Sequence, residues 1–201
     1  MSTLGLVIED RRRYHHGSLR QTLLEEGRRL LLEEGERAVS LRELARRAGV
    51  SHAAPQRHFA DRDALLDAIA AHGFDELTAN LVEARSPGDT GQRLAAYARA
   101  HVAFSVANGP LMELMFARPG ALTRSGSATS RSAARFAEVG AAMFEPEDDG
   151  RFDSLPWVLA AMLEGIGGLA ASGRLPLEHV EDVTDSAVRV LLPSVLDRVG
   201  P

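Results

Sequence analysis

The sequence contains no cysteine among its 201 residues, and its 23 basic residues are all arginine because lysine is absent too. Without cysteine the chain has no disulfide, no thiolate nucleophile and no cysteine-based zinc site. The rest of the composition, with 45% hydrophobic and 25% charged residues, is ordinary for a globular protein.

Long apolar runs are also scarce. The short stretch 4–8 precedes the first arginines, which reverses the order found in a signal peptide. Residues 155–172 form one long apolar segment, but Glu164 lies near its middle and three glycines weaken it as an isolated helix. We therefore expect a cytoplasmic protein with no membrane partner.

The net charge of −5 hides an uneven distribution. Residues 1–60 carry 11 arginines and 8 acidic residues, a charge of +3, whereas residues 61–201 carry 12 arginines and 20 acidic residues, a charge of −8. Arginine suits two-pronged hydrogen bonding to phosphate and guanine. The first part therefore favours a nucleic-acid contact, although a biased genomic composition explains the arginines equally well.

The segment from Ser40 to Phe59 has the pattern of a helix-turn-helix. Ser40 and Glu43 have the spacing of a capping box, which predicts that a helix begins at residue 41. Gly49 stands where a helix commonly ends on a left-handed residue.

A second short helix is predicted over residues 52–58. Because Pro55 lacks the amide that would bond the Ser51 carbonyl, this helix begins late or has a 3₁₀-like first turn. Its small and polar side chains suit contact with thymine methyls, base edges and phosphates. The predicted DNA contacts are Arg13, Tyr14, Ser40, Arg42, Ser51, His52, Ala53, Gln56, Arg57, His58 and Arg62.

The remaining pattern predicts an all-α fold. A helix capped by Ser18 should run to about Glu34, and five more helices are expected after the break at 86–91, over 92–107, 111–117, 132–144, 155–172 and 177–199. Pro193 should kink or shorten the last of these. The predicted parts are a flexible arm (1–13), a three-helix helix-turn-helix domain (14–60), a connecting helix (61–85) and a helical effector-binding and dimerisation domain (86–201).

Two features of the N-terminus leave alternatives open. The arginines at the end of the arm either reach DNA or belong to a solvated, disordered terminus. The adjacent histidines at 15 and 16 have no third ligand close in sequence, so we expect no metal or other cofactor.

No catalytic motif is present, and we expect no enzyme activity. An effector pocket is predicted among adaptable aromatic and methionine side chains of the C-terminal part. His101 is either a pocket residue or a core residue, and Glu164 either meets a polar or cationic effector or bonds across a dimer axis. The candidate pocket residues are Tyr97, His101, Phe104, Met112, Met115, Phe116, Phe136, Trp157 and Glu164.

Three segments together carry a resemblance to a known family. Residues 14–20 (YHHGSLR), 40–51 (SLRELARRAGVS) and 57–66 (RHFADRDALL) resemble the N-terminal domain of TetR-family transcriptional regulators. The family usually has tyrosine where Gln56 stands, and that tyrosine typically touches backbone phosphate. Gln56 either donates to phosphate or reads a base.

The C-terminal part resembles the TetR subgroup with a WHG-type domain, through residues 110–116 and 163–175. Glu164 occupies the histidine position of that signature and Ala160 its tryptophan position, so that Gly165 alone is kept. The resemblance implies a homodimer, joined through its last two helices, that represses transcription from a palindromic operator and is released by a small-molecule effector. The alternatives are an activator, or a helical small-molecule-binding protein or enzyme whose helix-turn-helix is vestigial.

Overall fold

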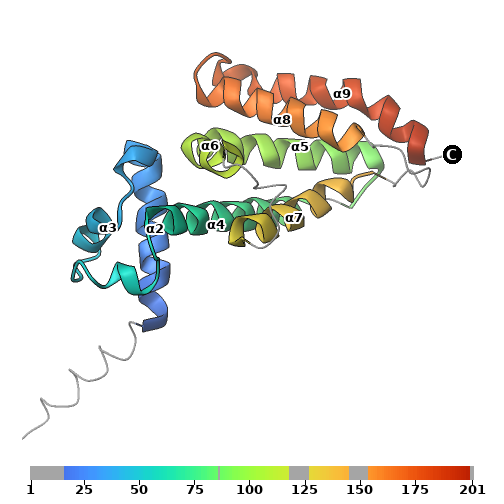
Figure 1. The fold of residues 1–201 in the computed structure, drawn as a ribbon. Helices are drawn as coiled ribbons and strands as arrows, with labels where there is room; N and C mark the ends of the chain where they lie inside the picture. The colour runs from blue at the N-terminus through green and yellow to red at the C-terminus, as the bar shows by residue number, and fades with distance from the viewer. Residues whose placement is uncertain (1–15, 86, 118–126, 145–153, 200–201) are drawn as a thin grey trace, which may run out of the picture. The chain divides into compact units, whose positions relative to one another are not determined.

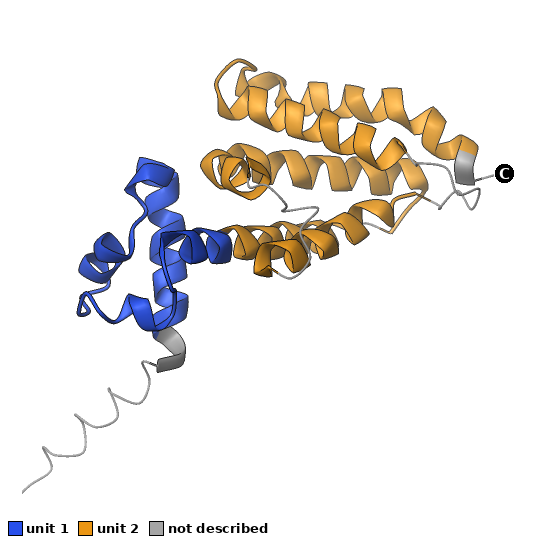
Figure 2. Cartoon of the chain, viewed as in Figure 1, with its two compact units in different colours: residues 1–69 blue, residues 70–201 orange. Residues whose placement is uncertain are grey.

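The computed structural model describes residues 16–85, 87–117, 127–144 and 154–199, and within these ranges the chain forms only α-helices, 3₁₀ helices and connecting turns. The predicted all-α fold is therefore confirmed. Two compact units share the chain, residues 1–69 and residues 70–201 (Figure 2). The division falls inside α4 (Arg62–Glu83), which runs through it as one continuous helix.

The first unit is a small helical bundle. Its elements are α2 (His16–Glu34), η1 (Glu36–Ala38), α3 (Leu41–Arg47), η2 (Pro55–Arg57) and the beginning of α4. α2 contacts η1 and α3, and α3 contacts η2. Leucines spaced along the helices supply the core, where the fully buried side chains include Leu23, Leu30, Leu31, Leu44, Leu65 and Leu66.

Glycines follow α2 and α3, and the one after α3 stands where the sequence predicted it. Gly35 follows α2 with φ 82°, and Gly49 follows α3 with φ 65°. Both values lie in the left-handed region that glycine enters without a steric penalty. After Gly49 the amide of Val50 bonds back to the carbonyl of Ala45 at 3.0 Å. This bond closes the corner that leads out of α3.

The second unit is built around α5 (Thr90–Ala107). The remaining elements are α6 (Gly109–Ala117), α7 (Ala128–Ala141), α8 (Leu155–Ala171), η3 (Leu177–His179) and α9 (Val180–Val199). α5 packs along α8 and α9 on one side and contacts α6 near its end (Figure 1). Within the unit Phe74 of α4 stacks edge-on against Phe116 of α6, with ring centroids 5.2 Å apart.

Several predicted helix starts differ from the observed ones. α2 begins at His16, earlier than the predicted start after Ser18. α7 begins at Ala128 rather than residue 132, because the Ser127 hydroxyl accepts the Ser130 amide and caps the helix. Residues 177–179 form a separate 3₁₀ turn before α9. Residues 118–126 lie outside the described ranges.

Pro193 does not shorten the last helix. α9 continues through it to Val199. An interior proline costs a helix one backbone hydrogen bond. Here the apolar side chains of Leu191 and Val195, both buried, hold the two flanking turns against the unit.

Candidate nucleic-acid interface and ligand cavities

α3 is capped as the sequence predicted. Ser40 has extended backbone dihedrals, and its hydroxyl accepts the amide of Glu43 at 3.2 Å. The Glu43 carboxylate in turn accepts from Arg46 and from Arg47. These two hydrogen-bonded guanidinium groups, Arg46 first, lower the pKa of Glu43 to about 2.

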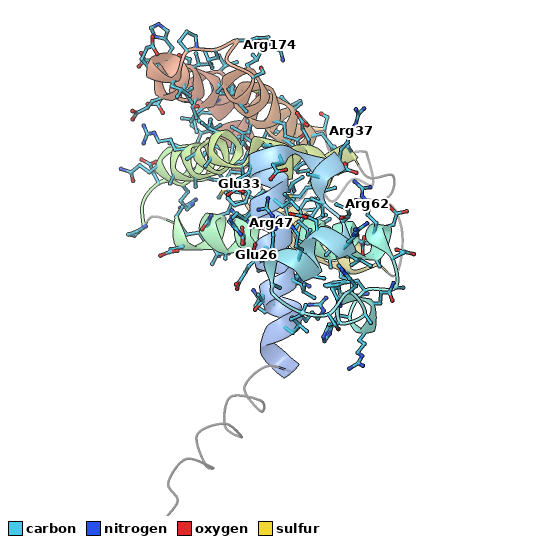
Figure 3. All side chains as sticks on the ribbon, turned by 90° about the vertical axis from the view of Figure 1, so that its left-hand side faces the viewer. Glu26, Glu33, Arg37, Arg47, Arg62 and Arg174 are labelled. Atoms are coloured by element: carbon cyan, nitrogen blue, oxygen red, sulfur yellow. The ribbon has the colours of Figure 1, made fainter. Side chains whose placement is uncertain are left out.

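Arg47 joins α3 to α2. Besides Glu43 it reaches Glu33 at 3.3 Å (Figure 3). It also pairs with Glu34, the last residue of α2. Its side chain is only 15% exposed. Arg47 therefore stabilises the bundle from within, in contrast to Arg42, which is exposed on the same short helix.

The second helix of the motif is not an α-helix, and the prediction of a helix over 52–58 was wrong in that respect. Residues 52–54 form turns, and Pro55–Arg57 form a 3₁₀ helix. The amide of Ala54 donates a hydrogen bond to the Ser51 carbonyl at 3.0 Å. Pro55 cannot donate to that carbonyl because it has no amide hydrogen. A 3₁₀ helix, which the sequence offered as an alternative for the first turn, is therefore present, but at Pro55–Arg57 and after a turn.

This turn presents an exposed strip. Pro55 points inward and is buried, whereas the side chains exposed to solvent are Ser51, His52, Ala53, Gln56 and Arg57, with His58 partly covered. Phe59 then enters the core at 3% exposure, as expected of an anchoring residue. The Arg20 guanidinium lies 5.4 Å from the Phe59 ring centroid, a cation–π contact that the sequence pattern did not indicate.

Arg62 has a role that the sequence did not anticipate. Its guanidinium donates to the backbone carbonyl of Val39 at 2.9 Å and to that of Glu36 at 2.6 Å. Asp61 caps the same helix, accepting the Ala64 amide at 2.8 Å. Arg62 therefore ties the first turn of α4 to η1, and its predicted contact with DNA stays a prediction.

The cations available to a ligand near this strip are few. Among the described residues, Arg42 and Arg57 are exposed and form no ion pair, whereas Arg46, Arg47 and Arg62 are held by acidic side chains or carbonyls. Arg13 and Tyr14, two further predicted contacts, lie outside the described residues.

The second unit holds an aromatic cluster around His101. Its ring lies 5.9 Å from that of Phe136 and 6.3 Å from that of Tyr97, and Phe136 continues the cluster to Phe74 and Phe116. Both ring nitrogens of His101 are buried without a hydrogen-bond partner among the described residues. Burial lowers the pKa of His101 to about 4 and raises that of Tyr97 to about 12.

Cavities open between the described helices of this unit, and two of them have predicted pocket residues in their walls. The larger, about 340 Å³, lies between α5, α6 and α8 and has Met112, Phe116 and Glu164 in its wall. The smaller, about 160 Å³, has Tyr97 in its wall together with Arg85 and Arg93.

The predicted pocket residues are therefore divided among several places. His101, Phe104, Met115 and Phe136 are core side chains that line neither cavity, and Trp157 is 56% exposed on α8. The larger cavity also has lining residues that sequence reasoning missed, namely Ser105, Gly109, Pro110, Glu113, Gly167, Gly168, Ala171 and Ser172. Only the glycine run in α8 hinted at them.

The described helices hold no segment that combines the length and the hydrophobicity needed to cross a membrane. Within those same ranges, no three acidic or histidine side chains gather as a metal site would require.

A capped short helix, a glycine corner and an exposed basic turn, built on a small helical bundle, define a helix-turn-helix DNA-binding protein. Comparison with known proteins identifies the family. Residues 23–69 match the family model described as bacterial regulatory proteins, tetR family. A search of curated proteins finds no match.

Solved structures share the fold of this chain. A protein with unknown function from Rhodococcus sp. RHA1 is 36% identical, with a TM-score of 0.76 over 90% of this chain and 97% of that chain. The TetR family transcriptional regulator PfmR from Thermus thermophilus is 23% identical, with a TM-score of 0.61 over 85% of this chain and 97% of that chain. A TetR family transcription regulator from Marinobacter aquaeolei VT8 is 19% identical, with a TM-score of 0.64 over 88% of this chain and 97% of that chain.

The chain belongs to the tetR family of bacterial regulatory proteins. It is a DNA-binding transcriptional regulator, and regulators of this family are typically not enzymes.

Proposed function

We propose that this regulator is a homodimeric repressor that binds a palindromic operator and leaves it when a small molecule binds the C-terminal unit. α4 supports the proposal most directly. Its first turn is tied to η1 by Arg62, and further along Phe74 packs against Phe116 and Phe136. A ligand that moves α6 or α7 therefore acts on the helix that begins within the DNA-binding unit.

The DNA contacts in this proposal come from the exposed strip. Arg42 and Arg57 supply the uncompensated positive charge, and Gln56 and His52 supply hydrogen bonding to bases or phosphates. Ser51 and Ala53 are small enough to let the backbone approach the groove. Ser40, Arg13 and Tyr14 belong to the proposed contact surface on the strength of the family resemblance.

The proposed dimer uses the outer faces of α8 and α9. These faces expose large apolar side chains to solvent, namely Trp157, Val158, Leu169, Val183, Val190 and Leu196. Gly165 leaves open space beside α8, which permits close approach of a second helix. Two helices from each subunit would form a four-helix interface.

A two-fold dimer predicts the form of the operator. Two reading turns related by symmetry face half-sites about 34–36 Å apart, or one helical turn. The resemblance to the WHG-type subgroup, and the assignment of residues 61–85 as the connecting helix, belong to the same proposal.

The experiment is selection of bound genomic fragments by the purified full-length protein, followed by footprinting. The proposal expects a few enriched fragments that share an inverted repeat. A flat distribution of fragments at every salt concentration would leave the vestigial helix-turn-helix as the better interpretation. Repression is then tested with a reporter behind the enriched operator, where an activator would raise expression instead of lowering it.

A further inference from the structure

The cavity between α5, α6 and α8 is lined by apolar side chains, glycines and two glutamates. Its volume of about 340 Å³ lies at the lower end of the ~300–1,000 Å³ range typical of small-molecule sites. Met112 and Phe116 provide adaptable apolar surface. Gly109, Gly167 and Gly168 leave backbone exposed on the opposite wall.

Its charged lining residues have one sign. Glu113 and Glu164 both line the cavity, and neither an arginine nor a histidine does. Neither carboxylate forms an ion pair with any described residue. Glu164 is the more enclosed of the two, and burial raises the pKa of its carboxyl group.

A partly buried carboxylate without a partner is unfavourable unless it is solvated, protonated or neutralised by something that binds. An anionic ligand would be repelled by both carboxylates. A neutral ligand would compensate them only through the hydrogen bonds that it donates, which are weaker than charge-assisted ones. A positive charge is therefore the ligand property that improves the electrostatics of this cavity most.

We infer that this cavity binds a small organic cation with an apolar body, an amine or quaternary ammonium compound, with Glu164 as counter-ion and the Phe116 ring beside it. The inference rests on the proposed function only for the statement that the cation acts as effector. Aromatic rings attract cations through the negative face of the π system, and Phe116 is partly exposed in the cavity wall.

The cavity is also well placed for regulation within its unit. α6 supplies Met112, Glu113 and Phe116 to the lining, and the same helix lies close against α4. A Cβ added at Gly73 of α4 would stand 2.7 Å from the sulfur of Met115. Because the two helices are packed so closely, a cation that shifts α6 must also displace α4.

The binding test uses calorimetric titration of the full-length protein with three cations of increasing size: benzyltrimethylammonium, tetrapropylammonium and tetraphenylphosphonium. Benzyl alcohol and phenylacetate serve as neutral and anionic probes. We expect at least one cation to bind, with no heat from phenylacetate. Glu164→Gln should weaken that cation roughly tenfold, the loss of one close charge partner. Glu138→Gln, which alters a carboxylate at the smaller cavity, should leave binding unchanged.

Absence of binding by all three cations would overturn the inference, as would binding that is insensitive to Glu164→Gln in a folded variant. Competition for the selected operator is measured separately, by fluorescence anisotropy. Glu164-dependent binding without operator release keeps the cavity assignment and contradicts the effector role. Operator release by phenylacetate or benzyl alcohol but by none of the three cations keeps the proposed function and overturns the cation site.

Discussion

At the scale of single residues, Pro55 and His101 carry the most information. Pro55 removes one amide and thereby changes the shape of the reading turn, so that Gln56 and Arg57 project from a 3₁₀ helix instead of an α-helix. The sequence identified the missing amide correctly but could not decide how far its effect would spread. His101 shows the same limit, because its place on an apolar face was visible while its lack of any partner among the described residues was not.

Arg57→Ala should weaken operator binding, because Arg57 is an exposed guanidinium with no ion pair among the described residues. The expected loss is about 1–3 kcal/mol, with a shallower dependence of affinity on salt. Fluorescence anisotropy of the labelled operator, titrated with protein at several salt concentrations, measures the affinity and its salt dependence. Arg174→Ala removes an exposed arginine from the C-terminal unit and serves as the matched control. Equal affinities for the two variants would contradict the assignment of the reading turn.

His101→Leu should stabilise the protein, because it removes two buried nitrogens that lack partners within the described part of the chain. An unsatisfied buried polar group costs about 1–3 kcal/mol, so the free energy of unfolding near neutral pH should rise by an amount of that order. Denaturant unfolding followed by circular dichroism provides the value. The exposed His179 offers the control substitution His179→Leu, which should change little.

The same residue predicts a pH dependence. The folded-state pKa of His101, about 4, lies below its ordinary value of 6.5, so the unfolded chain takes up the proton first as pH falls. Stability of the wild type should therefore decrease between about pH 6.5 and pH 4, by roughly 3 kcal/mol relative to His101→Leu. Parallel stability curves for the two proteins would show that the imidazole is not buried neutral in the folded state.

At the scale of elements, local signals predicted where most helices end. Gly35 and Gly49 end α2 and α3 because left-handed backbone is accessible to glycine, and Ser40 starts α3 by satisfying a free amide. Signals that were overlooked also had local causes. Asp89 and Gln92 form a capping box that begins α5 at Thr90, two residues before the predicted start. The cavities were beyond sequence reasoning, because they depend on how far apart α5, α6 and α8 settle.

Gly167→Ala should destabilise the second unit, because a Cβ there would lie 2.5 Å from the Cβ of Ser105 on α5. Such overpacking typically costs about 1–3 kcal/mol. Thermal unfolding of Gly168→Ala is the matched control, since the space beside that glycine is open and alanine favours a helix by up to about 1 kcal/mol. The idea of a close α5–α8 crossing fails if both variants unfold at the same temperature.

At the scale of the whole molecule, the account depends on association of two chains. One reading turn carries too few free cations for a tight complex, and a dimer doubles them on one duplex. The exposed side chains of α8 and α9 mark the surface that a partner would cover. The family resemblance predicted these two helices as the interface. The structure adds which of their apolar side chains are exposed to solvent.

Val190→Glu should convert the dimer to a monomer, because Val190 is 75% exposed on α9 and a buried carboxylate opposes association. Sedimentation velocity should give twice the 21.6 kDa chain mass for the wild type and the single mass for the variant. Ala137→Glu on the exposed side of α7 is the control and should remain dimeric. A monomeric wild type, or a dimeric Val190→Glu, would exclude this interface.

The most direct test of the central claim is the affinity of the full-length protein for its selected operator, compared with a scrambled duplex of equal length at several salt concentrations. The account predicts operator binding about a thousandfold tighter or more than binding to the scrambled duplex, with both affinities falling steeply as salt rises. Equal affinities for the two duplexes at every salt concentration would contradict a sequence-specific regulator.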